Sequence, residues 1–324
     1  MVTIKEMAQE LGVSTTTVSN VIHGKTKEVS LANIERIQKI LKKYDYTPNI
    51  NARNLASKRS KIIGLLIKSK QNKIANRFED PFIGRILGAI ERHVRQKGYY
   101  LMVYAVDDVH QVQQFTMSWN MDGLITSGFV EGDIRYLKER FKNPIAIIDD
   151  YDTNGLGNCV NIRIEDEQAE YLLTKYVISC GHRKLAFLAD NLVNLDKIRF
   201  QGFCRALKEA NIPVSREENF IQIYASDAGE PQNMDEIYEK SFSYTALLCA
   251  SDYYAVYIEN MLLDRGRKIP EEISIAGFDD VPISRIVRPA LTTVRQDIQA
   301  KGIAAVEELL KLIEGESEDK IVQL

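Results

Sequence analysis

From Lys61 onward, short apolar runs alternate with amphipathic helical patterns over about 260 residues. The runs are continuously apolar, which is typical of parallel strands buried on both faces. Strands are expected at KIIGLLI, YYLMVYAV, DGLITSG, PIAIID, KLAFLA, FIQIYA, TALLCA and SIAGF. Helices are expected over residues 82–98, 109–119, 133–140, 166–179, 197–210, 231–241, 253–264 and 298–313. This alternation predicts an α/β fold with parallel sheets and right-handed crossovers, and its length favours two similar lobes.

The first 24 residues show a different pattern, in which two short helical segments are separated by a three-residue turn. Thr3 and Glu6 have the spacing of a capping box, and Gly12 permits the backbone reversal that ends the first helix. Ser14 is placed to cap the second helix. The pattern predicts a helix-turn-helix, and the alternative is an ordinary helical hairpin with a Ser/Thr-rich exposed face.

A third helix is expected over residues 30–44, which completes a small three-helix head. The stretch that follows is polar and basic. Pro48 ends the preceding helix, and Asn49 is placed to cap a short helix that runs to about Ala56. A helix of this length is too short to be stable alone in water, so the stretch is either a plain linker or a helix that folds on DNA.

These patterns divide the chain into three parts. We expect a helix-turn-helix DNA-binding domain at residues 1–47, a hinge helix or linker at residues 48–60, and a two-lobed domain at residues 61–324. The resemblance given below implies that this last part is an effector-binding and dimerisation domain. Residues 1–60 carry ten Lys/Arg against five Asp/Glu, whereas the whole chain has a net charge of −3. A basic head on an acidic body is expected if only the head meets phosphate.

The sequence argues against several other classes of protein. The four cysteines are far apart and form no CxxC pair, which predicts reduced thiols in a cytoplasmic protein and no sulfur–metal site. No signal peptide and no membrane-length apolar run is present, and we expect neither a metal nor a cofactor. An enzyme is the second hypothesis because acids are plentiful, but no P-loop, HExxH or GxSxG string occurs. A transport receptor is the third, and the DNA-binding head argues against it.

Several strings, in this order, resemble the lactose-repressor/galactose-repressor family of bacterial transcription regulators. They are VTIKEMAQELGVSTTTVSNVI, YTPNINARNL, DPFIGRILGAIE, CGHRKLAFLAD, RFQGFCRAL and ASDYYAV…ISIAGFDDVP…LTTVRQD. The resemblance implies a periplasmic-binding-protein fold, with the chain crossing between two lobes more than once and a final strand cut short at Leu324. It also implies a non-enzymatic homodimer that binds double-stranded operator DNA under the control of a small-molecule effector, a sugar or sugar derivative.

Two sets of residues are expected to bind DNA. The exposed side of the second helix carries short hydrogen-bonding side chains, among which Asn20 suits adenine in the major groove. By resemblance, the hinge orders on operator DNA, and Leu55 wedges into the minor groove and kinks the duplex. The predicted DNA-binding residues are Thr3, Ser14, Thr15, Thr16, Thr17, Ser19, Asn20, His23, Asn49, Ala52, Arg53 and Leu55.

In open α/β folds, ligands lie outside the carboxyl ends of the strands, which selects polar or aromatic residues directly after each apolar run. The predicted effector-binding residues are Asp80, Phe82, Asp149, Asp150, Arg199, Asp252 and Asp280. By resemblance, Phe82 stacks on a sugar ring, and Arg199 and Asp252 grip hydroxyls. Many sugar-binding relatives have arginine at the position of Asp150, which leaves the effector class open. The alternatives are that the strand-end aspartates cap helices and that Phe82 belongs to the core.

Overall fold

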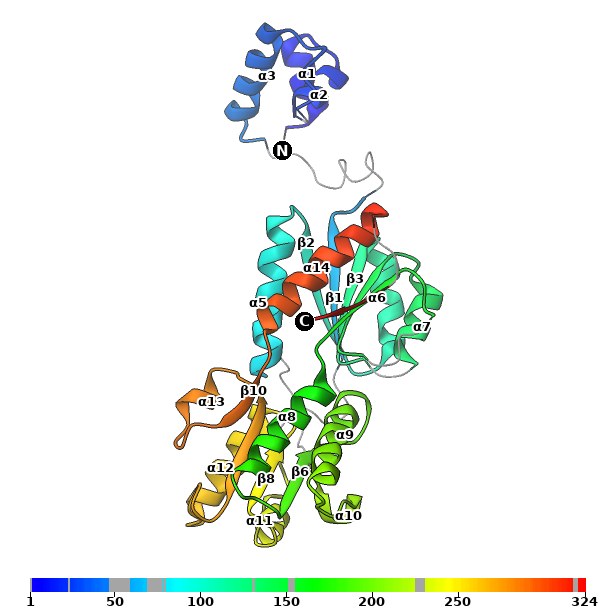
Figure 1. The fold of residues 1–324 in the computed structure, drawn as a ribbon. Helices are drawn as coiled ribbons and strands as arrows, with labels where there is room; N and C mark the ends of the chain where they lie inside the picture. The colour runs from blue at the N-terminus through cyan, green and yellow to red at the C-terminus, as the bar shows by residue number, and fades with distance from the viewer. Residues whose placement is uncertain are drawn as a thin grey trace. The chain divides into compact units, whose positions relative to one another are not determined.

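Figure 1 shows the fold in a computed structural model of the chain. The structure describes residues 2–22, 24–46, 59–68, 78, 80–129, 132–150, 155–224, 231–316 and 320–324. Contacts within the chain divide it into two compact units, Met1–Ser60 and Lys61–Leu324. The predicted hinge helix falls on residues outside the described ranges.

The first unit is a head of three helices, α1 (Ile4–Leu11), α2 (Thr15–Ile22) and α3 (Leu31–Lys43). The capping box of α1 is confirmed: the Thr3 N–H donates to the Glu6 carboxylate at 2.8 Å, and the Glu6 N–H donates to the Thr3 hydroxyl at 3.3 Å. Gly12 ends α1 with φ of 67°, in the left-handed region that favours glycine. The backbone reversal that was predicted at Gly12 is therefore confirmed.

The head has its own small core. The buried side chains Met7, Ala8, Val18, Val21 and Ile37 come from all three helices. Polar contacts join α3 to α1, because the Arg36 guanidinium donates to the Leu11 carbonyl at 2.9 Å. Glu10 accepts from Lys43 at 2.8 Å and from the Tyr44 hydroxyl at 2.7 Å. The polar contacts thus hold α3 against α1, and the burial of Val18 and Val21 packs α2 against both.

The second unit has two lobes, and lobe 1 contains a six-stranded sheet in the order β11-β5-β4-β3-β1-β2, with every pairing parallel. Its strands are β1 (Ile62–Lys68), β2 (Tyr100–Val106), β3 (Gly123–Ser127), β4 (Ile145–Ile148), β5 (Cys159–Arg163) and β11 (Lys320–Gln323). One face is covered by α5 (Pro81–Gln96) and α14 (Ile298–Glu314), and the other by α6 (Val112–Trp119) and α7 (Asp133–Arg140). Covering both faces explains why the strand sequences are continuously apolar.

Lobe 2 repeats this plan with a five-stranded parallel sheet in the order β10-β9-β8-β6-β7. Its strands are β6 (Leu185–Ala189), β7 (Phe220–Gln222), β8 (Ala246–Cys249), β9 (Ser274–Asp279) and β10 (Thr292–Arg295). One face packs against α8 (Asp166–Ser179) and α9 (Asn194–Glu209), and the other against α11 (Met234–Ser241) and α12 (Asp252–Asp264). The short helices α10 (Arg216–Asn219) and α13 (Ile283–Ile286) lie in connections.

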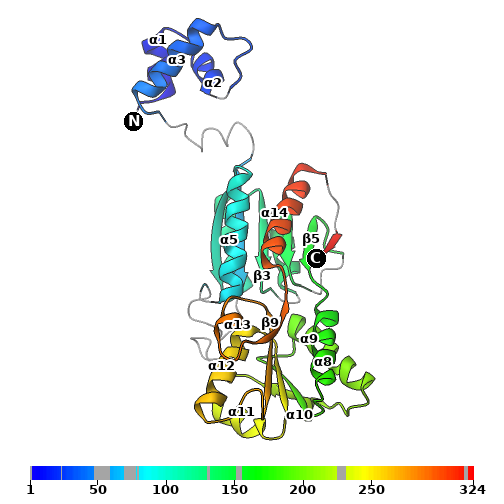
Figure 2. The ribbon, with the colours of Figure 1, turned by 60° about the vertical axis from the view of Figure 1, so that its left-hand side comes forward.

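Within the described residues, the chain crosses between the lobes twice. It enters lobe 2 between the end of β5 at Arg163 and the start of α8, and it returns between the end of β10 at Arg295 and the start of α14 (Figure 2). Both connections are short. The two lobes are therefore joined by a pair of strand-to-helix segments, which we call the first and second crossovers, in agreement with the expectation of more than one crossing.

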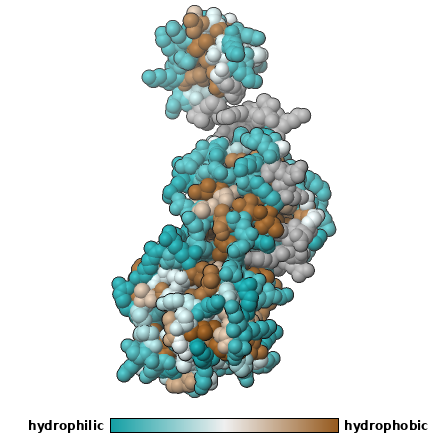
Figure 3. All heavy atoms as spheres, viewed as in Figure 1, coloured by the Kyte–Doolittle hydropathy of each residue, from teal (hydrophilic) through white to brown (hydrophobic). Residues whose placement is uncertain are grey.

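The apolar sides of the helices are turned onto the sheets. In the space-filling view of Figure 3, most of the visible surface of the second unit is hydrophilic, with smaller hydrophobic patches on both lobes. The α/β fold with two parallel sheets is confirmed. Sequence patterns missed β5 and β10, because CVNIR and TTVR mix polar and apolar residues and lack a continuous apolar run. For the same reason KIVQ gave no pattern for β11, the final strand that only the resemblance implied. They also placed the start of α9 too late, since the helix begins at Asn194.

The close packing of α8 on α9 depends on a glycine. A Cβ atom on Gly202 of α9 would lie 2.1 Å from the backbone oxygen of Glu167 in α8, which is too close for any side chain. Gly202→Ala should therefore lower the free energy of unfolding by about 1–3 kcal/mol, measured by urea denaturation. The control is Gly88→Ala on α5, where a Cβ meets no described atom within 4 Å, and it should be neutral or slightly stabilising. Equal stability of both variants would contradict the close contact.

Candidate functional site

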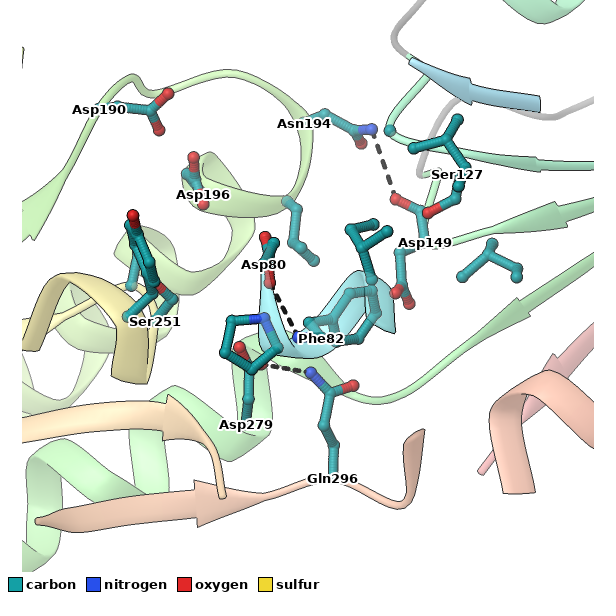
Figure 4. A pocket seen from close by; sticks show the side chains of 18 of the residues that line it. Asp80, Phe82, Ser127, Asp149, Asp190, Asn194, Asp196, Ser251, Asp279 and Gln296 are labelled. Carbon is teal, nitrogen blue, oxygen red and sulfur yellow. Dashed lines mark hydrogen bonds between the residues drawn. The ribbon is translucent and has the colours of Figure 1, made fainter. Parts of the chain in front are cut away.

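A cavity of about 250 Å³ lies between the two lobes. Its walls come from the carboxyl ends of strands in both sheets, including Lys68 at the end of β1. Ser127 of β3, Asp190 after β6 and Ser251 after β8 also line it (Figure 4). In parallel sheets these ends meet at one edge, and here the edges of the two lobes face each other. This is the position at which open α/β folds bind ligands.

Four of the predicted effector residues line this cavity, namely Asp80, Phe82, Asp149 and Arg199. Asp80 is also the N-cap of α5, because its Oδ1 accepts from the Phe82 N–H at 2.8 Å. The capping alternative and the predicted location in the cavity thus both hold for this residue. Asp149 follows β4 with φ of 59°, a left-handed conformation that aspartate adopts more readily than most residues.

Asp252 is not among the described residues that line the cavity, and its carboxylate is committed within lobe 2. It is fully buried and accepts from the Val281 N–H at 2.9 Å and from the Thr293 hydroxyl at 2.5 Å. Burial raises the pKa of Asp252 to about 6. The prediction that Asp252 grips an effector hydroxyl is therefore corrected: the residue ties the start of α12 to the loop after β9 and to β10.

Asp280 and Asp150 also lie outside the described lining of the cavity. The Asp280 carboxylate pairs with Arg285, which lowers its pKa, and it lies 3.9 Å from Arg295. Asp150 is buried, and its backbone oxygen accepts from the Asn161 side chain. Asp279, the neighbour of Asp280, takes the predicted place in the cavity because β9 continues through it. Adjacent strand residues point to opposite faces, which explains the error of one position.

Asp279 is a buried acid at the floor of the cavity. Its carboxylate accepts from the Gln296 amide at 2.5 Å and lies 3.9 Å from the Arg199 guanidinium. Burial raises the pKa of Asp279 to about 8, and the nearby Arg199 charge opposes this shift only in part. Its φ of 114° lies in a region that L residues rarely adopt. Residues held in such conformations are frequent in binding sites, where the surrounding structure enforces them.

Most contacts of the Arg199 guanidinium are made with other groups of the protein. Nε donates to Asp166 at 2.9 Å, and Nη1 donates to the Ala250 carbonyl at 2.6 Å. The Phe278 ring lies under the guanidinium, 3.6 Å from Cζ. Burial lowers the pKa of Arg199, but Asp166 and Asp279 outweigh that effect and raise it. Arg199 is thus a permanently charged part of the cavity wall whose position is fixed before any ligand arrives.

The sequence patterns missed several lining residues. Ser127 and Asp190 directly follow or end apolar runs, so the strand-end rule would have selected them had it been applied to every strand. Gln296 lies in the second crossover, and no local pattern marks it. The strand-end rule does reach Asp279, which directly follows the run SIAGF. The other polar or aromatic residues that the structure adds include Lys68, Asn194, Asp196, Ser251, Tyr253 and Tyr254.

The two lobes touch directly beside the cavity. The Asn194 side chain, at the start of α9, donates to the backbone oxygens of Phe129 and Asp149 in lobe 1, both at 3.4 Å (Figure 4). A second contact between the lobes is made by the Arg85 guanidinium of α5, which donates to the Asp280 backbone oxygen at 3.2 Å. These contacts join residues of opposite lobes, so their formation depends on the angle between the lobes.

Acidic side chains outnumber basic ones around the cavity. Among the described lining residues, the acids are Asp80, Asp149, Asp190, Asp196 and Asp279, and the bases are Lys68 and Arg199. Both bases form ion pairs with acids outside the lining, Lys68 with Asp133 and Arg199 with Asp166. The wall therefore offers mainly hydrogen-bond acceptors, together with the Phe82 ring. A ligand that fits this chemistry carries several donor groups, such as hydroxyls.

In the head, the structure separates capping residues from free ones. The hydroxyls of Thr3, Ser14 and Thr17 are engaged at helix starts, since Ser14 Oγ accepts the Thr17 N–H at 3.0 Å and contacts the Thr17 hydroxyl at 2.8 Å. Thr15 and Thr16 are exposed on α2, and Ser19 and Asn20 are half-buried beside them. The predicted DNA contacts His23, Asn49, Ala52, Arg53 and Leu55 lie outside the described residues.

The described residues also limit other chemistry. Across the described ranges, no group of three or more His, Cys, Asp or Glu side chains is arranged to hold a metal ion. None of the helices that the structure describes combines the length and the apolar composition needed to cross a membrane. A helix-turn-helix head joined to a two-lobed core with a ligand-sized cavity defines a DNA-binding transcription regulator with an effector-binding core.

Comparison with known proteins identifies the family. Residues 3–49 match the model of bacterial regulatory proteins of the lacI family, and residues 174–324 match the model of a periplasmic binding protein-like domain. The HTH-type transcriptional repressor PurR of Pasteurella multocida (strain Pm70) is 29% identical over 331 residues, covering 99% of this chain and 95% of that protein. The ribose operon repressor of Haemophilus influenzae is 30% identical over 327 residues, covering 98% and 94%. The chain belongs to the lacI family of bacterial regulatory proteins.

A solved structure supports the fold. The lac repressor dimer bound to operator and the anti-inducer ONPF aligns with a TM-score of 0.85 at 24% sequence identity, covering 99% of this chain and 96% of that one. At this identity the likeness concerns the fold alone. It agrees with the α/β lobes described above and with the helix-turn-helix head.

Glu170, buried in α8 behind Arg199, should make stability depend on pH. Burial raises the pKa of Glu170 to about 8, whereas a glutamate in an unfolded chain titrates near 4.3. Between these values the folded state keeps a proton that the unfolded state has lost, so the free energy of unfolding falls as pH rises. Glu170→Gln should flatten this fall between about pH 5 and pH 8 in urea titrations. A slope equal to that of the exposed control Glu139→Gln would contradict the assignment.

Proposed function

We propose that the chain is a homodimeric repressor whose affinity for operator DNA is set by a sugar or sugar derivative bound between the two lobes. The observation that carries this proposal is the cavity itself. Both lobes contribute to its wall, its charged groups are mainly acceptors, and the Phe82 ring forms an apolar surface within it. Hydroxyls donate to carboxylates in fixed geometry, and the apolar face of a sugar ring suits an aromatic side chain.

The relatives agree with this class of ligand without fixing it. One of them is named as a ribose operon repressor, and the lac repressor structure contains the anti-inducer ONPF. Another is named PurR, and Asp150 replaces the arginine expected in many sugar-binding relatives. The described lining of this cavity, which includes five acids, favours a ligand with many hydroxyl donors or an added amine.

Operator binding is assigned to the head and the hinge. On α2, the exposed Thr15 and Thr16 and the neighbouring Ser19 and Asn20 offer short hydrogen-bonding groups to base edges. A single head reads one half-site, so a two-fold dimer on a pseudo-palindromic operator follows. We further propose that the hinge of residues 48–60 orders on DNA, with Leu55 as the apolar wedge.

Effector and operator are coupled through the lobes. A ligand that bridges the lobes favours one angle between them, and the hinge connects directly to lobe 1 through β1. A change of lobe angle then alters the order of the hinge, which shifts the population that binds DNA. By linkage, operator DNA changes the affinity for the effector by the same factor.

The first experiment tests base reading by α2. Asn20→Ala should weaken binding to the specific operator by roughly 1–3 kcal/mol while binding to random DNA stays unchanged, because an amide that contacts adenine confers sequence preference. Operator DNA for this titration is selected from a random pool with the wild-type protein. An equal loss on random DNA would show that Asn20 only contacts phosphate.

The second experiment tests the cavity with pentoses, hexoses and amino sugars in thermal-shift titrations. The titrations are run near pH 9, above the pKa of about 8 that burial gives Asp279, so that its carboxyl is ionised. For the sugar that stabilises the wild-type protein there, Asp279→Asn should weaken binding roughly 10–100-fold, because a hydrogen bond to a charged group contributes about 1.5–3 kcal/mol. Asp280→Asn should bind normally, since that carboxylate pairs with Arg285 outside the cavity. If Asp280→Asn weakened sugar binding more than Asp279→Asn did, Asp280 and not Asp279 would be the effector-binding residue. Absence of stabilisation by any sugar would reject the proposed effector class.

A further inference from the structure

A chain of buried or nearly buried polar side chains runs along the wall of the cavity and passes through both crossovers. We call it the crossover chain, and it consists of Asp166, Arg199, Asp279, Gln296, Lys301 and Asp149. Asp166 begins α8 at the first crossover, and Gln296 lies in the second. Asp149 belongs to lobe 1 and Asp279 to lobe 2, so the crossover chain spans the two lobes.

Lys301, in the first turn of α14, is the cation at the lobe 1 end. Its side chain is fully buried, and Nζ donates to both carboxylate oxygens of Asp149 at 2.8 Å and to Gln296 Oε1 at 2.7 Å. An ammonium has three protons to donate, and these three acceptors account for all of them. The ring centroid of Phe82 lies 5.7 Å from Nζ, which adds a cation–π contact.

The ammonium also decides which way the Gln296 amide faces. Because Lys301 can only donate, the amide oxygen must face it, and the amide NH₂ must face the other way. That NH₂ donates to Asp279 of lobe 2. Reversal of the amide would turn its NH₂ toward the Lys301 ammonium, so that donors would face each other and the ammonium would lose an acceptor. Lys301 therefore determines the hydrogen-bond polarity of Gln296, a residue that lines the cavity.

The remaining links continue into lobe 2. Asp279 lies 3.9 Å from the Arg199 guanidinium, which in turn donates to Asp166 at 2.9 Å. Rotation of one lobe against the other moves Asp149 and Lys301 relative to Asp279 and Arg199. Since Gln296 is bonded to both sides, a change of lobe angle must lengthen or break one of its two hydrogen bonds.

Breaking the crossover chain has a cost because its members are shielded from water. Removing one partner of a buried ion pair leaves an uncompensated charge, which is far less favourable than removing both partners. Burial raises the pKa of the Asp149 carboxyl, and Lys301 opposes that rise. Without the ammonium, Asp149 would either take up a proton or turn toward the cavity and its water.

We propose that Lys301 is a positioning residue that holds the two lobes at one angle and presents Asp149 and Gln296 to the cavity in fixed orientations. Lys301 itself is not among the described residues that line the cavity, so it acts through these two. Only the consequence for effector binding rests on the proposed function. The angle between the lobes is a property of the protein alone, and its test uses neither effector nor DNA.

The test measures the distance between spin labels on the two lobes of the full chain. One label is placed on the native, exposed Cys180 of lobe 2 and the other on Glu139→Cys, at an exposed position of α7 in lobe 1, in a Cys204→Ser background. The labelled protein is diluted into an excess of unlabelled protein, so that distances within one chain dominate. Wild-type protein should give one narrow distribution. Lys301→Met should give a broader distribution with its centre displaced.

Three further variants complete the design. Lys301→Arg keeps the charge and should restore most of the narrow distribution. Lys311→Met is the matched control, because Lys311 lies on the same helix and pairs with Glu308 at 2.8 Å but is 46% exposed and outside the crossover chain. It should leave the distribution unchanged. The double variant Lys301→Met/Asp149→Leu removes both buried charges, so it keeps a folded protein available if Lys301→Met alone does not fold.

We expect the distance distribution to be displaced in Lys301→Met and in the double variant. It should match the wild-type distribution in Lys311→Met and closely approach it in Lys301→Arg. A wild-type distance distribution in a folded Lys301→Met protein, or in the double variant, would overturn the proposal. Displacement in Lys311→Met as well would also overturn it, because the effect would then be general to α14. None of these outcomes depends on the identity of the effector, so the proposed function can fail or stand independently.

Discussion

A guanidinium cannot be buried without partners, and the arrangement of the core follows from how Arg199 is satisfied. Its partners come from separate parts of the chain: Asp166 at the first crossover, the Ala250 carbonyl after β8, and the Phe278 ring on β9. Forming these contacts brings the start of α8, the start of α9 and two strand ends to one point. The same point is the floor of the cavity. The contacts that stabilise lobe 2 are therefore also the contacts that shape its binding surface.

The strand ends next to this point share a strained backbone. Asp149, Asp279 and Asp280 all have positive φ, at 59°, 114° and 51°. Aspartate tolerates the left-handed region better than most residues, yet such conformations still cost free energy and persist only where the surroundings enforce them. Here the surroundings are ion pairs and hydrogen bonds to Lys301, Gln296 and Arg285. Strained backbone and buried charge are thus concentrated at the junction of the lobes. Regulation by a change of lobe angle requires that only a few angles be stable, and these directed contacts limit their number.

Residue patterns predicted those features that depend on neighbours in sequence. Capping at Thr3 and Ser14 needs only a three-residue spacing, and the apolar strands need only a continuous run, so both were found. The position of the cavity was also predicted, because the residues that follow each apolar run can be identified from the sequence alone. The strand-end rule selects both Asp279 and Asp280 and does not resolve which of them points into the cavity. Resemblance favoured Asp280, whereas Asp279 lines the cavity. The strand β10 was missed because it lies at the edge of its sheet, where only partial burial is needed and the sequence TTVR contains no continuous apolar run.

The role of Lys301 shows the limit of such patterns in physical terms. In the sequence it is one more lysine in an amphipathic helix, where the usual expectation is a solvated charge. Its partner Asp149 is 152 residues away, and only the folding of α14 onto β4 brings the two together. A charge this deep is retained at a cost in desolvation, which an apolar residue would avoid. The arrangement makes sense if the pair serves orientation more than stability, because apolar packing tolerates many lobe angles whereas two directed ion-pair hydrogen bonds tolerate few.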